Sequence, residues 1–322
     1  NNLRYRSAEQ QKDHFGYTDQ NITARYTNAE TGKYAFQAKL NLNISDSFSN
    51  GNGQSVFSQG NLQNEHGTVH NRASNYLNPT LDLYYSKNIG KKDELSLNLV
   101  GSHYDTNSTQ FDREWILNSN QDVFNNDMIL KAKQNGIVAE VAHSHSFEKG
   151  KLNSGYRISN NSISNDLQNL AGNSNYTVNY LQQYLYTEYS GKKDKFTYRL
   201  GLGLTNIHNK SAETTFDEWA FTPKIVLGYQ LKNNQSIRFS SSYIPQSPSS
   251  DALSSNVVQV VPNIVRTGNP YLKSQHSFGN NLVYSFNSKY FDLNANAFYW
   301  FRNRASNQYY VLNQNVDGYL LT

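Results

Sequence analysis

The 322-residue sequence predicts an all-β protein, an antiparallel up-and-down β-barrel that spans a membrane. Three observations lead to this fold class. The composition favours strands over helices, apolar and polar residues alternate along many segments, and the connections between these segments are alternately short and long. Each observation fits several architectures when taken alone, but the three together favour a transmembrane barrel.

The composition excludes several other classes of protein. The chain has no Cys, which excludes zinc fingers, thiol catalysis and a disulfide framework. It has no apolar run near the ~18 residues that a membrane-spanning helix needs. Its 24 Tyr and 16 Phe, together with abundant Asn and Ser, suit strands and turns. The net charge of +4 is spread thinly and the lysines gather in short turns, so we expect no nucleic-acid partner.

Alternation between apolar and polar residues defines the predicted strands. From Lys33 to Ser45 the even positions are apolar and the odd positions are mostly polar. One face of this strand is therefore apolar, and the other is polar and suited to contact with water. The same pattern recurs, in order, at 81–85, 95–99, 137–141, 152–158, 196–204, 225–231, 237–243, 278–286 and 291–301. We expect about twelve strands, many of about ten to thirteen residues, which exceeds the ~5–6 residues usual in globular sheets.

The connections between these strands alternate in length. The short turns are Asn28–Lys33, Gly90–Glu94, Glu148–Lys151, Gly191–Lys195, Lys232–Gln235 and Asn287–Tyr290. The long connections expected between them are Asp46–Tyr76, Asp105–Asn135, Ser159–Tyr176, Asn209–Trp219 and Pro245–Gln275. Brief turns at one end and long loops at the other are typical of transmembrane barrels, whereas soluble sandwiches use Greek-key crossovers.

The aromatic residues and the polar face of the strands support the same fold. Phe286 and Phe291 flank one short turn, and Tyr189 and Phe196 flank another. Rings at strand ends fit the two membrane interfaces, although aromatic residues also flank turns in soluble sheets. The polar face is mostly uncharged, which suits a water-filled barrel interior and explains a mean hydropathy of −0.75 with only 17% charged residues.

One stretch of the sequence resembles a known family. It contains Glu218-Trp219-Ala220-Phe221-Thr222-Pro223, a hairpin through residue 240, and then Gly268-Asn269-Pro270-Tyr271-Leu272-Lys273 before a new strand from Phe278. This is similar to the barrel of TonB-dependent outer-membrane receptors of the type common in Bacteroides-like bacteria. In that family a Gly-Asn-Pro-x-Leu-Lys segment re-enters the barrel after a long outer loop. The resemblance implies a barrel of 22 strands preceded by a plug domain and an energy-coupling box.

The sequence departs from that family in extent. We see about twelve or thirteen strands and neither a plug domain nor a coupling box. We therefore expect residues 1–322 to be a single, partial barrel domain of a longer polypeptide, and we regard a complete twelve-stranded barrel as the weaker alternative.

No group of residues predicts an enzyme, because the sequence brings together no nucleophile, base and orienting residue. We expect no catalytic, cofactor-binding or metal-binding residues. His143 and His145 share one face of a strand, but no Asp, Glu or Cys lies near them in the sequence, so we interpret them as plain barrel-wall histidines.

Four residues are weak candidates for ligand binding in the expected long loops. His66 and His70 could grip a metal or ligand, although a disordered loop is the simpler interpretation. Arg113 and Trp115 place a charge beside an indole and could contact a sugar or a partner, although a loop that packs on itself is again simpler.

By resemblance, the protein is a receptor in the outer membrane of a Gram-negative bacterium. It would import an iron chelate, vitamin, glycan or peptide into the periplasm. Its partners would be outer-membrane lipids, a small nutrient ligand, the plug domain and the TonB energy-coupling complex, with a surface lipoprotein as a further candidate. The alternatives are a passive outer-membrane channel or structural barrel without TonB coupling, and a soluble extracellular adhesin or glycan-binding module.

Overall fold

The fold is known from a computed structural model, which describes residues 5–59, 62–261, 264–313 and 318–321. Its elements are β1 (Tyr5–Glu30), β2 (Tyr34–Gln59), β3 (Leu62–Asn88), β4 (Asp93–Ile116), β5 (Gln121–Phe147), β6 (Gly150–Asn169), β7 (Gly172–Lys193), β8 (Phe196–Ser211), β9 (Thr215–Phe221), β10 (Lys224–Lys232), β11 (Gln235–Gln246), α1 (Ser250–Leu253), β12 (Val258–Val261), β13 (Ile264–Arg266), β14 (Gln275–Asn287), β15 (Asp292–Asn303), β16 (Tyr310–Asn313) and β17 (Gly318–Leu321). In the described part, no helix has the length and apolarity to cross a membrane.

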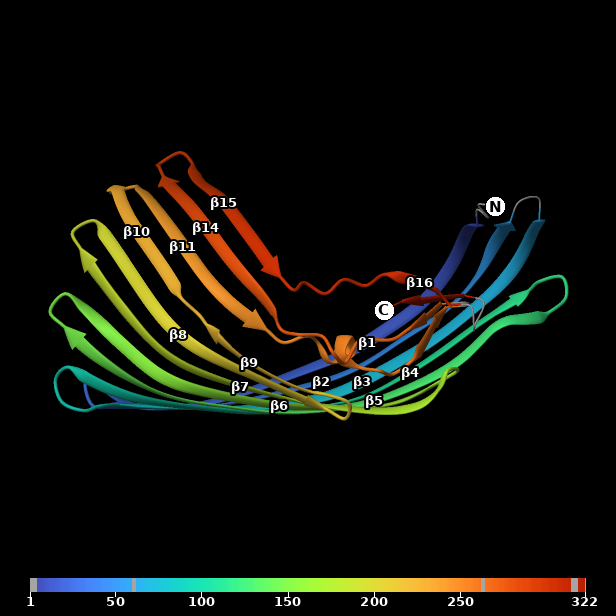
Figure 1. The fold of residues 1–322 in the computed structure, drawn as a ribbon, viewed down its shortest axis with the longest axis horizontal. Helices are drawn as coiled ribbons and strands as arrows, with labels where there is room; N and C mark the ends of the chain where they lie inside the picture. Colours follow the sequence, from blue (N-terminus) through green and yellow to red (C-terminus); the bar gives the residue numbers. More distant parts are fainter. Residues whose placement is uncertain (1–4, 60–61, 262–263, 314–317, 322) are drawn as a thin grey trace.

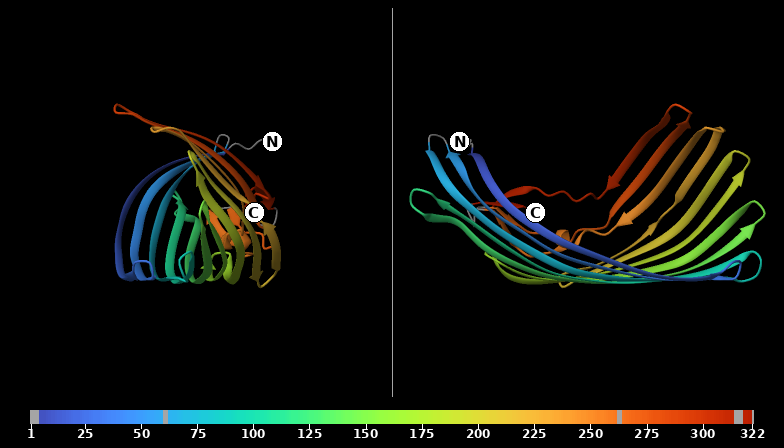
Figure 2. Two further views of the ribbon diagram at one scale, coloured as in Figure 1. Left: turned by 90° about the vertical axis from the view of Figure 1, so that its left-hand side faces the viewer. Right: turned by 180° about the vertical axis from the view of Figure 1, so that it is seen from behind.

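The main sheet confirms the predicted up-and-down topology. It runs in the order β1 to β8, then β10, β11, β14 and β15, and each strand is antiparallel to the next. β9 and β10 pair with successive stretches of β8, so the two occupy one position in the sheet, which gives the twelve positions expected. Figures 1 and 2 show that the sheet is strongly curved, with a concave and a convex face. In the described residues no ladder joins β1 to β15, so the sheet is open at these edges.

The short turns lie where the sequence predicts them. The prediction of long loops is wrong for most of the expected ranges, which form strands joined by short turns. β4 and β5 are joined by residues 117–120, β6 and β7 by 170–171, and β8 and β9 by 212–214. Asp46–Tyr76 likewise lies almost entirely in β2 and β3, whose ladder continues to Gln59 and Leu62. Of the five expected long connections, only Pro245–Gln275 joins two neighbouring strands of the main sheet through a long segment.

The physical reason for this error is that in strands such as β2, β3 and β4 the distal half, remote from the short turns, is mostly polar on both faces. In β4, Leu95, Leu97 and Leu99 are followed on the same face by His103 and Asp105. About nine to eleven tilted residues cross a bilayer. A strand of 24 residues therefore crosses the apolar layer with its proximal half and extends into water with its distal half, where the alternation that marks strands in the sequence is lost.

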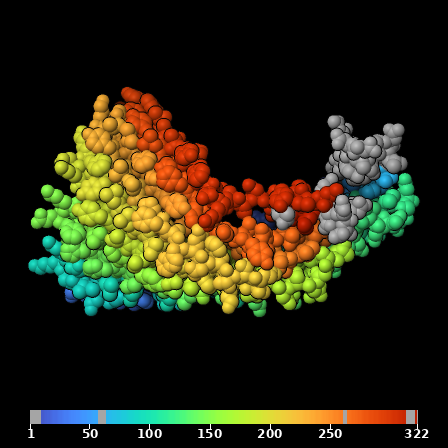
Figure 3. Space-filling model, viewed as in Figure 1, coloured from blue at the N-terminus to red at the C-terminus, as the bar shows by residue number. Residues whose placement is uncertain are grey.

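The long connection identifies the concave face as the inside of the barrel. Its helix α1 places Leu253 against Tyr176 and Val178 of β7, and Val178 is 0% exposed. Figures 1 and 2 show α1 within the concavity, and Figure 3 shows the orange connection packed against the yellow strands. Because side chains alternate along a strand, Tyr184, Tyr186 and Glu188 share this concave face while Leu185 and Tyr189 lie on the convex face.

The Gly-Asn-Pro segment is held against this helix. The Gly268 N–H donates to the carbonyl of Ser254 at 2.8 Å, and the Asn269 N–H donates to that of Ala252 at 2.7 Å. A Cβ on Gly268 would lie 2.5 Å from two backbone oxygens of α1, so only glycine permits the contact. The segment therefore turns the chain inside the barrel and leads it back into the wall at β14.

Aromatic rings follow one another along the convex face near the short turns, as the sequence predicts for an interfacial belt. The rings of Phe147 and Tyr189 are 6.1 Å apart, those of Tyr189 and Tyr198 are 5.9 Å apart, and those of Tyr198 and Phe196 are 5.9 Å apart. The Tyr198 hydroxyl end lies over Gly191, where a Cβ would come within 2.5 Å of the phenolic oxygen.

We predict that Gly191→Leu destabilises the protein by about 1–3 kcal/mol, because the new side chain displaces the Tyr198 ring from the belt. A denaturant unfolding titration in lipid vesicles measures this cost. The matched control is Gly101→Leu, since nothing lies within 4 Å of a Cβ at Gly101. Equal stability of the two variants would contradict the packing role of Gly191.

Candidate functional site

The four candidate ligand-binding residues lie in strands rather than in loops. His66 and His70 belong to β3, and Arg113 and Trp115 belong to the neighbouring strand β4. The two strands pair over this stretch, with His70 opposite Asp112. The structure therefore brings the four residues to one distal region of the sheet and corrects their expected placement in loops.

The two histidines lie on the concave face and contact carboxylates. His66 is 5% exposed, and its Nδ1 lies 2.5 Å from Oε1 of Glu114. His70 Nε2 lies 3.4 Å from Oδ1 of Asp13, and the Gln11 amide nitrogen lies 2.7 Å from His70 Nδ1. Glu114 belongs to the adjacent strand β4, whereas Asp13 and Gln11 belong to β1, so the His70 contacts reach across β2. Over the described residues, no group of three metal-ligating side chains is arranged to hold a metal ion.

Arg113 and Trp115 lie on the opposite, convex face of the same region. The Arg113 guanidinium carbon is 4.9 Å from the centre of the Trp115 ring, which is a cation–π contact. Arg113 also pairs with Asp122 of β5 at 2.8 Å. The four candidates consequently form two separate groups, one facing the barrel interior and one facing outward above the apolar band.

We predict that the His66–Glu114 contact stabilises the distal sheet. In a double-mutant cycle with His66→Ala and Glu114→Ala, we expect a coupling energy of about 1 kcal/mol or more, because His66 is buried and the carboxylate is largely shielded from water. Denaturant unfolding of the four proteins measures it. A coupling energy of zero would contradict the contact.

The centre of the concave face carries a network of charged and phenolic groups. The Tyr186 hydroxyl donates to Glu140 Oε1 at 2.5 Å. The Glu188 carboxylate forms two ion pairs: its Oε1 lies 3.2 Å from Arg199 Nε, and its Oε2 lies 3.4 Å from Lys224 Nζ. These residues belong to no local sequence motif, and their alternation with Leu185 and Leu200 is the only sequence signal that points to them.

A hollow of about 360 Å³ adjoins this network beside the long connection. Its walls include Arg157, Gln182, Tyr184, Thr205 and Lys224. Arg157 has no carboxylate within ion-pair distance among the residues that the structure describes. The hollow therefore offers a guanidinium, an ammonium, hydroxyls and an amide to a polar or anionic group inside the barrel.

The histidine pair of β5 has a partner that sequence spacing could not reveal. Asp93, the first residue of β4, lies opposite His145, and its Oδ1 is 2.7 Å from His145 Nδ1 and 3.0 Å from His143 Nε2. The hydrogen bond from His145 is the main reason that the pKa of Asp93 is lowered. This cluster lies on the convex face at the short-turn end, just before the apolar band begins at Leu95.

A search of curated proteins finds no match to the sequence. The model of the outer membrane protein beta-barrel family, in contrast, matches residues 86–322, which is most of the chain. The chain belongs to this outer membrane protein beta-barrel family. Its location is therefore the outer membrane of a Gram-negative bacterium.

Three solved structures show the same fold. The ferric-catecholate import receptor Fiu from E. coli K12 is 10% identical, with 91% of this chain and 57% of that chain covered and a TM-score of 0.57. The ferripyoverdine receptor of Pseudomonas aeruginosa is also 10% identical, with 98% and 51% covered and a TM-score of 0.58. The copper transporter OprC is 10% identical, with 99% and 57% covered and a TM-score of 0.57.

The family model confirms an outer-membrane β-barrel, and the three solved structures share its fold. At this identity the structures establish the fold alone. The chain spans only about half to three fifths of the length of each of the three structures.

Proposed function

We propose that the chain is part of the barrel of a TonB-dependent outer-membrane receptor that imports a nutrient into the periplasm. The observation that supports the proposal is that the sheet has an apolar convex face and a polar concave face. Leu97, Leu200 and their neighbours on the convex face suit lipid, whereas the concave face presents Arg157, Glu188 and Lys224 to water. A wide, polar interior of this kind suits the passage of a hydrophilic solute.

The mechanism follows from the position of the polar groups. A ligand would first meet the distal strands, where His66, His70 and the long connection line the inner surface. It would then pass the charged network of Glu140, Glu188 and Lys224. A plug domain seated in the barrel would close this route, and the TonB complex would open it by using energy from the inner membrane. The ligand class, an iron chelate, vitamin, glycan or peptide, is left open by these side chains.

The test is ligand-dependent growth of the host strain. A gene deletion should abolish growth on one compound from a panel of ferric siderophores, vitamin B12, glycans and peptides supplied as the sole source. Removal of TonB function should abolish the same growth. Growth that needs the gene but not TonB would instead favour a passive channel.

The passive channel remains the second candidate because the open polar concavity would also suit diffusion. Upstream sequence separates the two, since a plug domain and a coupling box support the receptor. The soluble adhesin is disfavoured by the family membership and by the apolar convex face. Expression of residues 1–322 without detergent tests it, because a monodisperse soluble monomer would contradict the membrane protein. We propose no enzymatic activity.

A further inference from the structure

The short-turn end of the barrel carries most of the lysines. The six short turns predicted from the sequence contain ten of the eighteen lysines of the chain and five carboxylates. The turns at the opposite end, residues 117–120, 170–171 and 212–214, contain no lysine. Because all six short turns emerge at one end of the sheet, the lysines form a positive rim beside the aromatic belt of Phe147, Tyr189 and Phe196.

Eight of these ten lysines lack an acidic partner among the described residues, and three of the eight lie in the β3–β4 and β5–β6 turns. In the described part of the chain, Lys91, Lys92 and Lys149 have no carboxylate within ion-pair distance, although Glu148 is the chain neighbour of Lys149. The other nearby carboxylates are engaged. Asp93 contacts His143 and His145, and Glu94 accepts Lys151 at 3.4 Å. The β3–β4 and β5–β6 turns thus present uncompensated positive charge.

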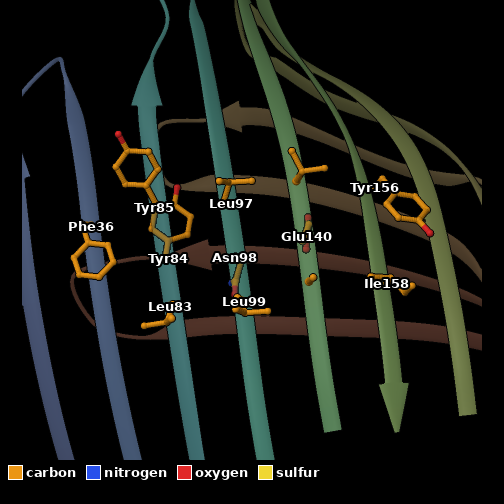
Figure 4. Close-up of a pocket in the computed structure, with 12 residues that line it drawn as sticks. Phe36, Leu83, Tyr84, Tyr85, Leu97, Asn98, Leu99, Glu140, Tyr156 and Ile158 are labelled. Carbon is orange, nitrogen blue, oxygen red and sulfur yellow. The ribbon is translucent and has the colours of Figure 1, made fainter. Parts of the chain in front are cut away.

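An apolar hollow opens on the convex face above these two turns. Its volume is about 440 Å³, and its apolar walls include Phe36, Leu83, Tyr85, Leu97, Val141 and Ile158 from β2 to β6. Figure 4 shows side chains of this hollow along the strands. Leu97 is five residues from Lys92 on an extended strand, which corresponds to about 17 Å. An acyl chain can bridge that separation.

We propose that this hollow and the lysines below it form a binding site for an anionic phospholipid of the periplasmic leaflet. One acyl chain lies in the hollow between β2 and β6, and the headgroup phosphate lies at Lys91, Lys92 and Lys149. His143 and His145 contribute by contacting Asp93. The Asp93 carboxylate lies on the convex face at this position and would otherwise repel the phosphate. The site does not depend on the imported ligand or on TonB.

A lipid accounts for these features better than a soluble acidic protein does. The lysines are distributed over all six turns, as a membrane plane requires, instead of gathering in one patch. They also adjoin lipid-facing aromatic rings and an apolar hollow, to which a soluble partner would have no access. Lysines near an anionic leaflet each contribute attraction that falls off within a Debye length.

Native mass spectrometry of the full-length protein tests the site. The protein is reconstituted in phosphatidylcholine nanodiscs that contain a minority of phosphatidylglycerol, and the phosphatidylglycerol retained per protein is measured. We expect the triple variant Lys91→Gln/Lys92→Gln/Lys149→Gln to retain about fivefold less, the effect of losing at least one lysine contact with an anionic surface. Ala139→Trp, which fills the hollow, should also reduce retention.

The matched control is Lys12→Gln/Lys131→Gln/Lys133→Gln, which removes the same charge from the distal half of the sheet and should retain the lipid as the unmodified protein does. Excess inorganic phosphate should not displace the lipid, since a phosphate alone cannot occupy the hollow. Unchanged retention in both the lysine variant and Ala139→Trp would overturn the proposal, and is the result expected if the lysines serve a soluble acidic partner.

Discussion

Leu200→Arg is expected to destabilise the folded protein by about 2–4 kcal/mol, because Leu200 lies at the middle of the apolar band and would place a guanidinium in lipid. Leu200 is 48% exposed in the isolated chain, and it stands between Phe196 near the short turn and Leu204 at the far edge of the band. A side chain at that height is too far from either interface for its charge to reach water easily. A folding titration in lipid vesicles measures the loss.

The control is the neighbouring residue on the other face. Gly201→Arg introduces the same side chain at the same depth, but on the concave, wet side. A Cβ there meets only ordinary contacts, 3.5 Å from Lys224 and 3.6 Å from Glu188, whose carboxylate can pair with the new cation. We expect a distinctly smaller cost than at Leu200. Leu97 and Asn98 form a second such pair. Equal costs on the two faces would refute the assignment of lipid and water.

Val178→Asp is expected to detach the long connection from the barrel wall and to cost more than about 3 kcal/mol, because it places an unpaired carboxylate in a buried apolar contact. Val178 is 0% exposed beneath Leu253 of α1, and Leu272 and Ile163 pack around the same cluster. Loss of this cluster would expose residues 247–257 to protease. Limited proteolysis of the folded protein, followed by mass mapping of the first cleavage site, measures the change.

Asn179→Asp provides the matched control, since Asn179 follows Val178 but is exposed on the opposite face of β7. Cleavage within residues 247–257 should accelerate in the Val178 variant and remain slow in the Asn179 variant. If neither variant changes the cleavage rate, the connection is not held by this cluster.

The sequence predicted the architecture well because the convex face follows a simple rule. Alternation at positions such as Leu95, Leu97 and Leu99 identifies the lipid-crossing part of each strand, and the short turns follow from the gaps between these patterns. The distal halves were missed because both of their faces are in water. There, a stretch such as Asp46–Tyr76 has the composition of a loop and the backbone of two paired strands.

The candidate residues were predicted less well because contacts between strands depend on register. His66 and Glu114 are far apart in the sequence, as are Asp93 and His143, and only the hairpin register brings each pair together. The charged network of Glu140 and Glu188 had no local motif at all. Residue type and spacing could propose His66, His70, Arg113 and Trp115, but could not divide them between the two faces of the sheet.

The absence of Cys makes the central claim, that convex side chains meet lipid and concave side chains meet water, directly measurable. Single Leu200→Cys and Gly201→Cys variants of the full-length protein in vesicles can each be labelled with a polarity-sensitive maleimide. The label at position 200 should report an apolar surrounding and be quenched by lipid-borne quenchers, and the label at position 201 should report water. Identical spectra and quenching at the two positions would contradict the assignment of a lipid face and a water face.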